Sequence, residues 1–249
     1  MKEEENKSAD SPAEIEMTFL EHLEELRWRI IYSLIGIVIG TVLAWIFIDF
    51  FVDQILLLPA RQANLKLQNL RPFGQLFIYF QVAIIIGLIL SFPNIALQFW
   101  RFVSPALKSK EKKYIKWIVL FTSLCFISGV VFAYFLMLPM TLKFAASFGS
   151  AAIENNFSID EYFSIILSVI LGAGLIFELP MLSFFLSKIG ILTPKIMRKY
   201  RRHSIVAIMI LSAILTPGTD PVSQVILAIP LVLLYEVSIF VSKIFQKKT

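Results

Sequence analysis

The sequence is poor in the residues that build disulfides, metal sites and covalent catalytic centres. Its 249 residues include one cysteine, Cys125, and two histidines. An intrachain disulfide is therefore excluded, and neither histidine has a second metal ligand at a useful spacing. The sequence also lacks a Walker phosphate loop, a zinc-protease motif and a nucleophile-elbow motif. These absences argue against ATP hydrolysis, against a bound cofactor or metal, and against an enzyme.

Charged residues are scarce, at 16 % of the chain, whereas 57 % of residues are hydrophobic. A soluble domain of this length could not bury so much apolar side chain. Crossing a hydrocarbon core of roughly 30 Å takes a helix of about 20 apolar residues. Four runs with almost no charge meet that length: residues 31–52, 73–99, 117–140 and 162–186. They lack the two-residue alternation of a membrane β-barrel, so we predict an all-α membrane protein.

The last part of the chain holds two weaker candidate spans. Residues 204–215 would extend only about 18 Å as a helix. Residues 222–245 are longer but are interrupted by Pro230 and Glu236. We interpret both as short transmembrane helices. A re-entrant hairpin is the alternative, and it leaves the C-terminus on the same side of the membrane.

Lysine and arginine cluster in alternate connecting segments, and such clusters mark the cytoplasmic side of a membrane protein. Six spans with both termini in the cytoplasm place every cluster on one side, so the positive net charge reflects orientation rather than nucleic-acid binding. The acidic start and the long first apolar run do not fit a cleavable signal peptide. We expect a polar cytoplasmic tail over residues 1–17 and one membrane domain over residues 18–249. Its predicted spans are residues 31–52, 75–99, 115–138, 162–187, 203–216 and 222–243.

Residues 19–30, before the first span, have the pattern of an amphipathic helix at the cytoplasmic interface. Its predicted apolar face consists of Phe19, Leu23, Leu26 and Ile30. Glu21, Glu24 and Glu25 point away from that face. From the spacing alone, we favour a local ion pair between Glu25 and Arg29, worth about a few tenths of a kcal/mol, over a binding role.

Two further acidic residues need a reason. Glu111 is the only acid in a strongly basic loop, where it either balances charge locally or presents a carboxylate to a cationic guest. Glu178 lies inside the fourth predicted span, and carboxylates in spans typically face a cavity and serve function. Pro180 removes a helical hydrogen bond and predicts a kink nearby. An ion site and a protein-guest site would both suit Glu178.

The turn before the last span also carries polar groups. Asp220 and Pro221 form an N-cap and first-turn pair for the final helix. Gln224 lies in the first turn of that helix, where its amide needs a hydrogen-bond partner.

Several short motifs occur in a fixed order from residue 19 to residue 245. They are HLEELRWR at 22–29, FWRFVSPAL at 99–107 with Glu111, FAYF at 132–135, FELP at 177–180, LTP at 215–217, and LAIP at 227–230 with YE at 235–236. Each motif alone is weak, but their order and the predicted topology are together highly specific. In these features the chain resembles the TatC family of the twin-arginine protein translocase.

The resemblance implies a concave, glove-shaped bundle of six transmembrane helices in the bacterial inner membrane, with the last two spans short. It implies a core receptor subunit that binds the twin-arginine signal peptides of folded cargo. It further implies single-span partners of the TatA/TatB type, homo-oligomers within the receptor complex, and transport driven by the proton-motive force. No cofactor is implied. The alternative is a proton- or cation-coupled secondary transporter with Glu178 as its ion site, although the absence of an internal repeat counts against it.

The resemblance also assigns residues to sites, and it replaces the local ion pair as our interpretation of Glu25. A guanidinium group can engage a carboxylate through two donors, which lysine cannot copy, so cytoplasmic carboxylates suit a paired-arginine ligand. The implied signal-peptide site consists of Glu25, Leu26, Arg27, Phe102 and Glu111. Glu178 is the implied polar residue of the concavity. Thr216 and Gln224 are implied to dock a partner helix.

Overall fold

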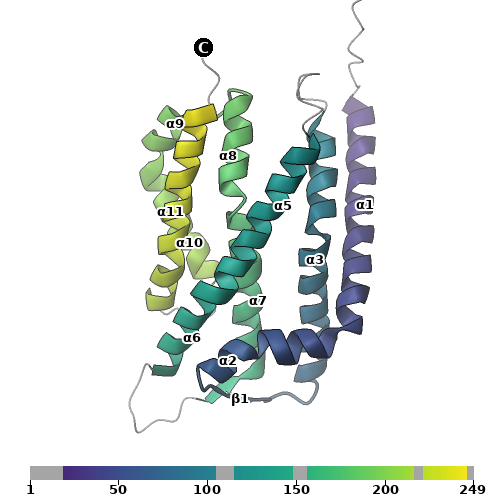
Figure 1. Cartoon of the computed structure of the whole chain (residues 1–249), viewed down its shortest axis with the longest axis vertical. Coiled ribbons are helices and arrows are strands. Elements are labelled where there is room, and N and C mark those ends of the chain that lie inside the picture. Colours follow the sequence, from purple (N-terminus) through teal and green to yellow (C-terminus); the bar gives the residue numbers. More distant parts are fainter. Residues whose placement is uncertain (1–18, 105–114, 148–155, 216–220, 246–249) are drawn as a thin grey trace, which may run out of the picture.

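The computed structural model describes residues 19–104, 115–147, 156–215 and 221–245. Long helices stand side by side in one bundle (Figure 1), which confirms the all-α class. The first half consists of α1 (Phe19–Ile46), the π-helical segment η1 (Phe50–Leu56), α2 (Leu58–Gln62), β1 (Lys66–Gln68) and α3 (Gly74–Val103). The second half consists of α5 (Ile115–Phe132), η3 (Ala133–Met137), α6 (Leu138–Ser147), β2 (Asn156–Ser158), α7 (Ile159–Ile176), α8 (Leu179–Lys188), α9 (Pro194–Lys199), α10 (Arg201–Leu215) and α11 (Pro221–Phe245).

Five helical segments of the described chain are long and apolar enough to cross a membrane. They are Leu20–Ile46, Gly74–Val103, Ile115–Ser147, Ile159–Lys188 and Gln224–Phe245. The predicted fifth span corresponds to α10, which has 15 residues and therefore extends about 22 Å. Because α10 packs against both α7 and α11, it belongs to the bundle. Its shortness agrees with the expectation of a short fifth span, and the six-span topology stays a prediction.

The N-terminal region differs from the sequence prediction in two ways. The predicted interface helix and the first span are one unbroken helix, α1, which ends at Ile46. The chain then turns, and η1 and α2 lie across one end of the bundle (Figure 1). Residues 50–52 therefore belong to this crosswise segment and not to the upright helix. Val52 and Leu56 of η1 are buried, so the protein core rather than lipid covers these two side chains.

Tyrosine hydroxyls attach the crosswise segment to the bundle. The hydroxyl of Tyr162 donates to the carbonyl of Leu56 at 2.6 Å and accepts from the amide of Ala60 at 3.1 Å. The hydroxyl of Tyr134 donates to the carbonyl of Ile55 at 2.8 Å. An irregular helix leaves backbone groups without intrahelical partners, and these hydroxyls satisfy some of them.

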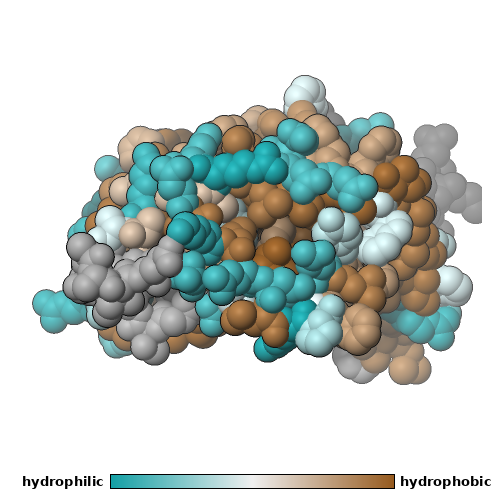
Figure 2. All heavy atoms as spheres, turned by 90° about the horizontal axis from the view of Figure 1, so that it is seen from below, coloured by the Kyte–Doolittle hydropathy of each residue, from teal (hydrophilic) through white to brown (hydrophobic). Residues whose placement is uncertain are grey.

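Two connections meet at the same end of the bundle. Strands β1 and β2 pair in parallel, with Lys66 opposite Asn156 and Gln68 opposite Ser158. Arg71 lies 3.8 Å from the carboxylate of Asp160. Viewed from this end, hydrophilic residues frame a hydrophobic centre (Figure 2). We call this the distal end of the bundle.

The crossing of α1 and α3 is close because glycine occupies the contact on both helices. A Cβ atom at Gly40 would collide with the carbonyl oxygen of Gly87, and one at Gly87 would collide with the backbone of Thr41. In a bilayer, the hydrophobic effect does not drive helices together, so their association depends on van der Waals contact. Small residues such as these glycines let the two backbones come close enough to make that contact. The crossing holds α1 against α3, the most extensive helix contact in the described bundle.

Candidate functional site

The end opposite the distal end is strongly basic. There α1 begins, α11 ends and α9 lies (Figure 1). The described lysines and arginines near it are Arg27, Arg29, Arg101, Lys116, Lys188, Lys195, Arg198, Lys199, Arg201, Arg202 and Lys243. Those toward the distal end are Arg61, Lys66, Arg71 and Lys143. We call the first the basic end, and its charge agrees with the side that the sequence predicts to be cytoplasmic.

At the basic end, α1 turns a mixed side toward the bundle, on which Glu25, Leu26 and Arg29 are partly buried. Leu23 and Ile30 of the predicted apolar face are 45 % and 50 % exposed. Glu25, which we expected to point away with the other acids, lies on the inward side and is only 18 % exposed. Glu24 remains on the outside and is 65 % exposed, so the three acids do not share one environment.

Glu25 belongs to a chain of hydrogen bonds that links α1 to α3. Arg29 donates to Glu25 Oε1 from Nη2 at 2.8 Å and from Nε at 3.3 Å. Its Nη1 donates to Gln98 Oε1 at 3.2 Å, and Gln98 Nε2 donates to Asn94 Oδ1 at 3.3 Å. Asn94 Nδ2 then donates to the carbonyl of Tyr32 at 3.1 Å. The i,i+4 ion pair considered from spacing is therefore present, within a larger network.

The second oxygen of the Glu25 carboxylate is unused. Glu25 Oε2 is buried and accepts no hydrogen bond from the residues that the structure describes. An ionised carboxylate has about four acceptor positions, and buried polar atoms are normally satisfied. Glu25 can therefore accept a further donor.

The other predicted signal-peptide residues fall into three groups. The ring of Phe102 stacks on His22 with centroids 4.4 Å apart, and Leu26 is half-buried on α1. Arg27 lies on the exposed side, 3.7 Å from Glu24 and over the ring of Trp28. Glu111 lies outside the described residues. The structure thus brings Glu25 and Phe102 to the α1–α3 contact and leaves Arg27 apart from them.

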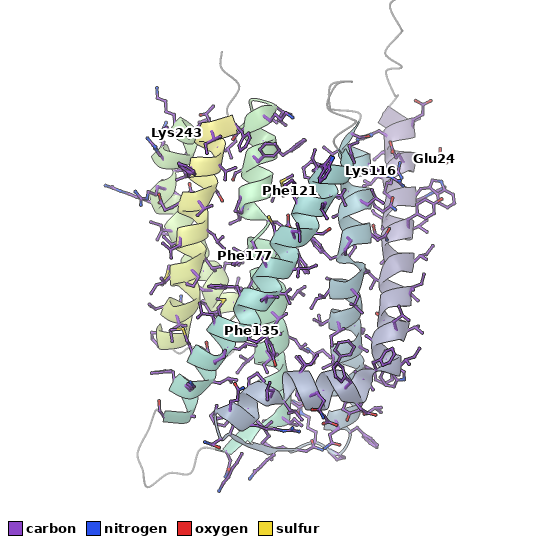
Figure 3. All side chains as sticks on the ribbon, viewed as in Figure 1. Glu24, Lys116, Phe121, Phe135, Phe177 and Lys243 are labelled. Carbon is purple, nitrogen blue, oxygen red and sulfur yellow. The ribbon has the colours of Figure 1, made fainter. Side chains whose placement is uncertain are left out.

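Glu178 lies at a break between two helices. The chain leaves α7 at Ile176 and starts α8 at Leu179, so the interruption occurs where Pro180 predicted it. Glu178 is 8 % exposed, and its Oε1 is buried with no hydrogen-bond partner among the described residues. The neighbouring Phe177 lies near mid-height of the bundle (Figure 3). Glu178 is therefore a buried carboxyl far from both ends.

Close packing holds this break against α5. A Cβ atom at Gly129 would collide with the carbonyl oxygen of Ala173 and with Phe177, and one at Gly174 would collide with Phe126. The rings of Phe132 and Phe177 lie 5.3 Å apart. Helix α5 of the same chain therefore occupies the space that Gly174 leaves open.

Gln224 finds its partner within the chain. Its Nε2 donates to the carbonyl of Met209 at 2.9 Å, which joins the first turn of α11 to α10. Thr216, the other residue of the predicted docking patch, lies outside the described residues. A role for this patch in docking a partner helix stays a prediction.

Sequence reasoning missed three residues of the α1–α3 contact, namely His22, which stacks on Phe102, and the network residues Asn94 and Gln98. Asn94 and Gln98 stand four residues apart within the second apolar run. Amides in a membrane span need partners, and their helical spacing places both on one face. That signal was present in the sequence, although it does not name the partner helix.

Comparisons with known proteins agree with this architecture. The family model described as Sec-independent protein translocase protein (TatC) matches residues 21–230. The TatC protein of Carboxydothermus hydrogenoformans is 38 % identical over 232 residues, which cover 93 % of this chain and 95 % of the relative. That of Aquifex aeolicus is 38 % identical over 236 residues, covering 93 % and 97 %.

A solved structure has the same fold. A crystal structure of the twin-arginine translocase receptor TatC superposes with a TM-score of 0.82 at 38 % identity, covering 90 % of this chain and 99 % of that one. The match does not favour the secondary-transporter alternative. The structure is a bundle of apolar helices with a buried carboxyl at a broken span, and the comparisons match it over nearly its whole length. The chain is therefore a member of the TatC family of Sec-independent protein translocase components, which are not enzymes.

Proposed function

We propose that the chain is the core receptor subunit of a twin-arginine translocase, and that its basic end binds the paired arginines of signal peptides on folded cargo. The observation that carries this proposal is the hydrogen bonding of the Glu25 carboxylate. Its Oε1 already holds the guanidinium of Arg29, and its Oε2 is buried without a donor among the described residues. The carboxylate therefore lies in surroundings that accept a guanidinium, with acceptor capacity left over.

An incoming arginine has two routes to this carboxylate. It either donates to Oε2 beside Arg29, or it displaces Arg29. In the second case Gln98, which already accepts from Arg29 and is itself held by Asn94, keeps a hydrogen bond to the displaced guanidinium. A planar guanidinium can donate two parallel hydrogen bonds to a carboxylate, whereas an ammonium group acts as a point charge. The site should therefore prefer arginine to lysine.

The remaining residues of the proposed site follow from this geometry and from the family resemblance. The half-buried Leu26 and the stacked Phe102 offer apolar surface next to the carboxylate. Glu111 supplies a second carboxylate on the basis of the resemblance. Arg27 also rests on the resemblance alone, because its guanidinium lies on the exposed side of α1.

The membrane-embedded part serves a later step in our proposal. Glu178, buried at the break between α7 and α8, hydrogen-bonds a polar residue on a single-span partner of the TatA/TatB type. Thr216 and Gln224 dock such a helix. Copies of the chain assemble in the receptor complex, and the proton-motive force drives transport.

We also propose that the protein resides in the bacterial inner membrane with both termini in the cytoplasm. Support comes from the basic end, where α1 begins and α11 ends among the clustered lysines and arginines. Orientation in bacterial membranes follows this charge bias.

Photocrosslinking of a signal peptide tests the proposal. A photoreactive residue at Leu26 should crosslink a twin-arginine signal peptide in isolated membranes, and the same probe at Lys195, elsewhere on the basic end, should not. A peptide with both arginines replaced by lysine is the matched ligand control. Equal crosslinking from both positions, or equal crosslinking of both peptides, would reject the proposed site.

A further inference from the structure

A cavity that the proposed function does not use opens between α5, α8 and α11. Its volume is about 530 Å³, within the range of about 300–1,000 Å³ that is usual for ligand pockets. It is lined by Trp117, Ile118, Phe121, Cys125, Pro180, Met181, Phe184, Lys188, Val241 and Phe245. We call it the α5–α8 groove. Its floor includes the buried Ile118 and Met181, whereas Trp117 and Phe121 on its wall are 61 % and 57 % exposed.

The groove exists because α8 packs mainly on α11 and only slightly on α5. The hydroxyls of Ser187 and Ser242 lie 2.6 Å apart in the α8–α11 interface, and the rings of Phe184 and Phe245 meet edge to face at 4.8 Å. Helix α5 crosses the bundle diagonally, and its upper end stands away from α8 (Figure 1). Aromatic side chains from all three helices wall the groove, namely Trp117 and Phe121 of α5, Phe184 of α8 and Phe245 of α11.

The depth of the groove identifies the kind of molecule that fits. Its lining runs from Trp117 to Cys125 on α5 and from Lys188 to Pro180 on α8. Eight residues of helix rise about 12 Å, and half of a hydrocarbon core is about 15 Å. The groove therefore serves one leaflet. A transmembrane partner helix crosses both leaflets, whereas an acyl chain occupies one.

The charge at the mouth identifies the headgroup. Among the described residues, Lys188 is the only charged one in the lining, and it stands in the last turn of α8 at the basic end. Its Nζ lies 5.8 Å from the centre of the Phe184 ring, so its stem runs along the aromatic wall. Lys116, one residue before Trp117, lies at the same end of the bundle (Figure 3). Tryptophan at a membrane interface and a lysine reaching toward headgroups are the usual neighbours of lipid phosphate.

We propose that the α5–α8 groove binds one anionic phospholipid from the leaflet at the basic end. An acyl chain fills the apolar groove, and the phosphate lies next to the ammonium group of Lys188. An apolar cavity of this kind gives water too few hydrogen-bond partners, so hydrocarbon is the suitable filling. This inference is independent of the signal-peptide site, because none of the described residues of that site, Glu25, Leu26, Arg27 and Phe102, lines the groove.

Trp117 provides a direct probe for the test. The purified full-length protein is placed in vesicles of zwitterionic phosphatidylcholine that contain increasing fractions of phosphatidylglycerol with brominated chains, which quench nearby tryptophan. Brominated phosphatidylcholine at the same fractions is the lipid control. The Trp117→Phe variant gives the quenching of the other three tryptophans, and the difference from wild type isolates Trp117.

We expect phosphatidylglycerol to associate with Trp117 about fivefold more strongly than phosphatidylcholine, which corresponds to about 1 kcal/mol for one lysine near an anionic headgroup. Lys188→Gln should remove this preference, and Lys188→Arg should keep it. Lys195→Gln, a change at the basic end outside the groove, should leave it unaltered. Equal quenching by the two lipids in wild type would mean that bulk lipid fills the groove. That outcome would overturn the proposal. A preference for phosphatidylglycerol that persists in Lys188→Gln would overturn it too, as would the absence of quenching by either lipid, because protein would then cover the groove.

Discussion

Neutralising Glu25 should weaken signal-peptide binding far more than neutralising its neighbour Glu24. The two glutamates adjoin on one helix, carry the same charge and pair with arginines of the same motif. Glu25 is mostly buried and has an unused buried oxygen, whereas Glu24 is 65 % exposed and lies 3.7 Å from an arginine that is 63 % exposed. Net charge and distance along α1 are thus matched, and only the environment of the carboxylate differs.

The expected magnitude follows from the contact that is lost. A hydrogen bond to a charged group contributes about 1.5–3 kcal/mol, so Glu25→Gln should raise the Kd of a twin-arginine peptide by about ten- to a hundred-fold. An exposed pair such as Glu24–Arg27 contributes about 0–1 kcal/mol, so Glu24→Gln should change the Kd by less than about fivefold. In Glu25→Gln the amide oxygen still accepts from Arg29, and Gln98 remains in place, so the helices should stay together.

Fluorescence anisotropy with a labelled twin-arginine signal peptide and the protein in nanodiscs measures both constants. A peptide with lysines in place of the arginines should bind weakly to wild type and should lose little more in Glu25→Gln. Thermal unfolding of each variant checks that the fold is retained. Equal Kd values for Glu24→Gln and Glu25→Gln would refute the reasoning, because charge alone would then explain binding.

Three further predictions follow from other parts of the molecule. Gly87→Ala should lower the free energy of unfolding by about 1–3 kcal/mol, measured by denaturation in detergent, because its Cβ meets the backbone of Thr41 and no side chain can yield. Glu178→Gln should keep much of the export of a folded reporter, since the amide still forms hydrogen bonds. Glu178→Ala should impair export but spare signal-peptide crosslinking. Full export by the alanine variant would contradict the role of this buried carboxyl. A cysteine at Gln62 should be labelled by an impermeant maleimide added outside intact cells and one at Lys195 should not, and outside labelling at Lys195 would rule out the six-span topology.

The elements of the fold were largely predictable because the bilayer imposes simple rules. Without water, a spanning backbone must satisfy its own hydrogen bonds, so long apolar runs form helices wherever they occur. Proline has no amide hydrogen, so the position of Pro180 fixed the break between α7 and α8 in advance. Charge clustering likewise predicted which ends of the helices lie together. Each of these effects acts over one turn or one span and needs no knowledge of the neighbours.

The end of α1 was not predictable in this way. Residues 50–52 are as apolar as those before them, and hydropathy cannot distinguish burial in protein from burial in lipid. Only the tertiary structure offers Tyr134 and Tyr162 to the irregular backbone of η1, which makes a crosswise path possible. The shortness of α10, by contrast, was visible from the length of its apolar run.

The orientation of the polar residues was decided by packing alone. Periodicity showed that α1 has a polar and an apolar face, but the choice of which face meets α3 depends on the partners that α3 presents. Asn94 and Gln98 supply those partners, and Gly40 and Gly87 bring the helices close enough for the network to form. The sequence by itself determined the helices, their break and their polarity. The network at Glu25 and the groove at Lys188 exist only because side chains from separate helices meet, and contacts of that kind are set by the tertiary structure.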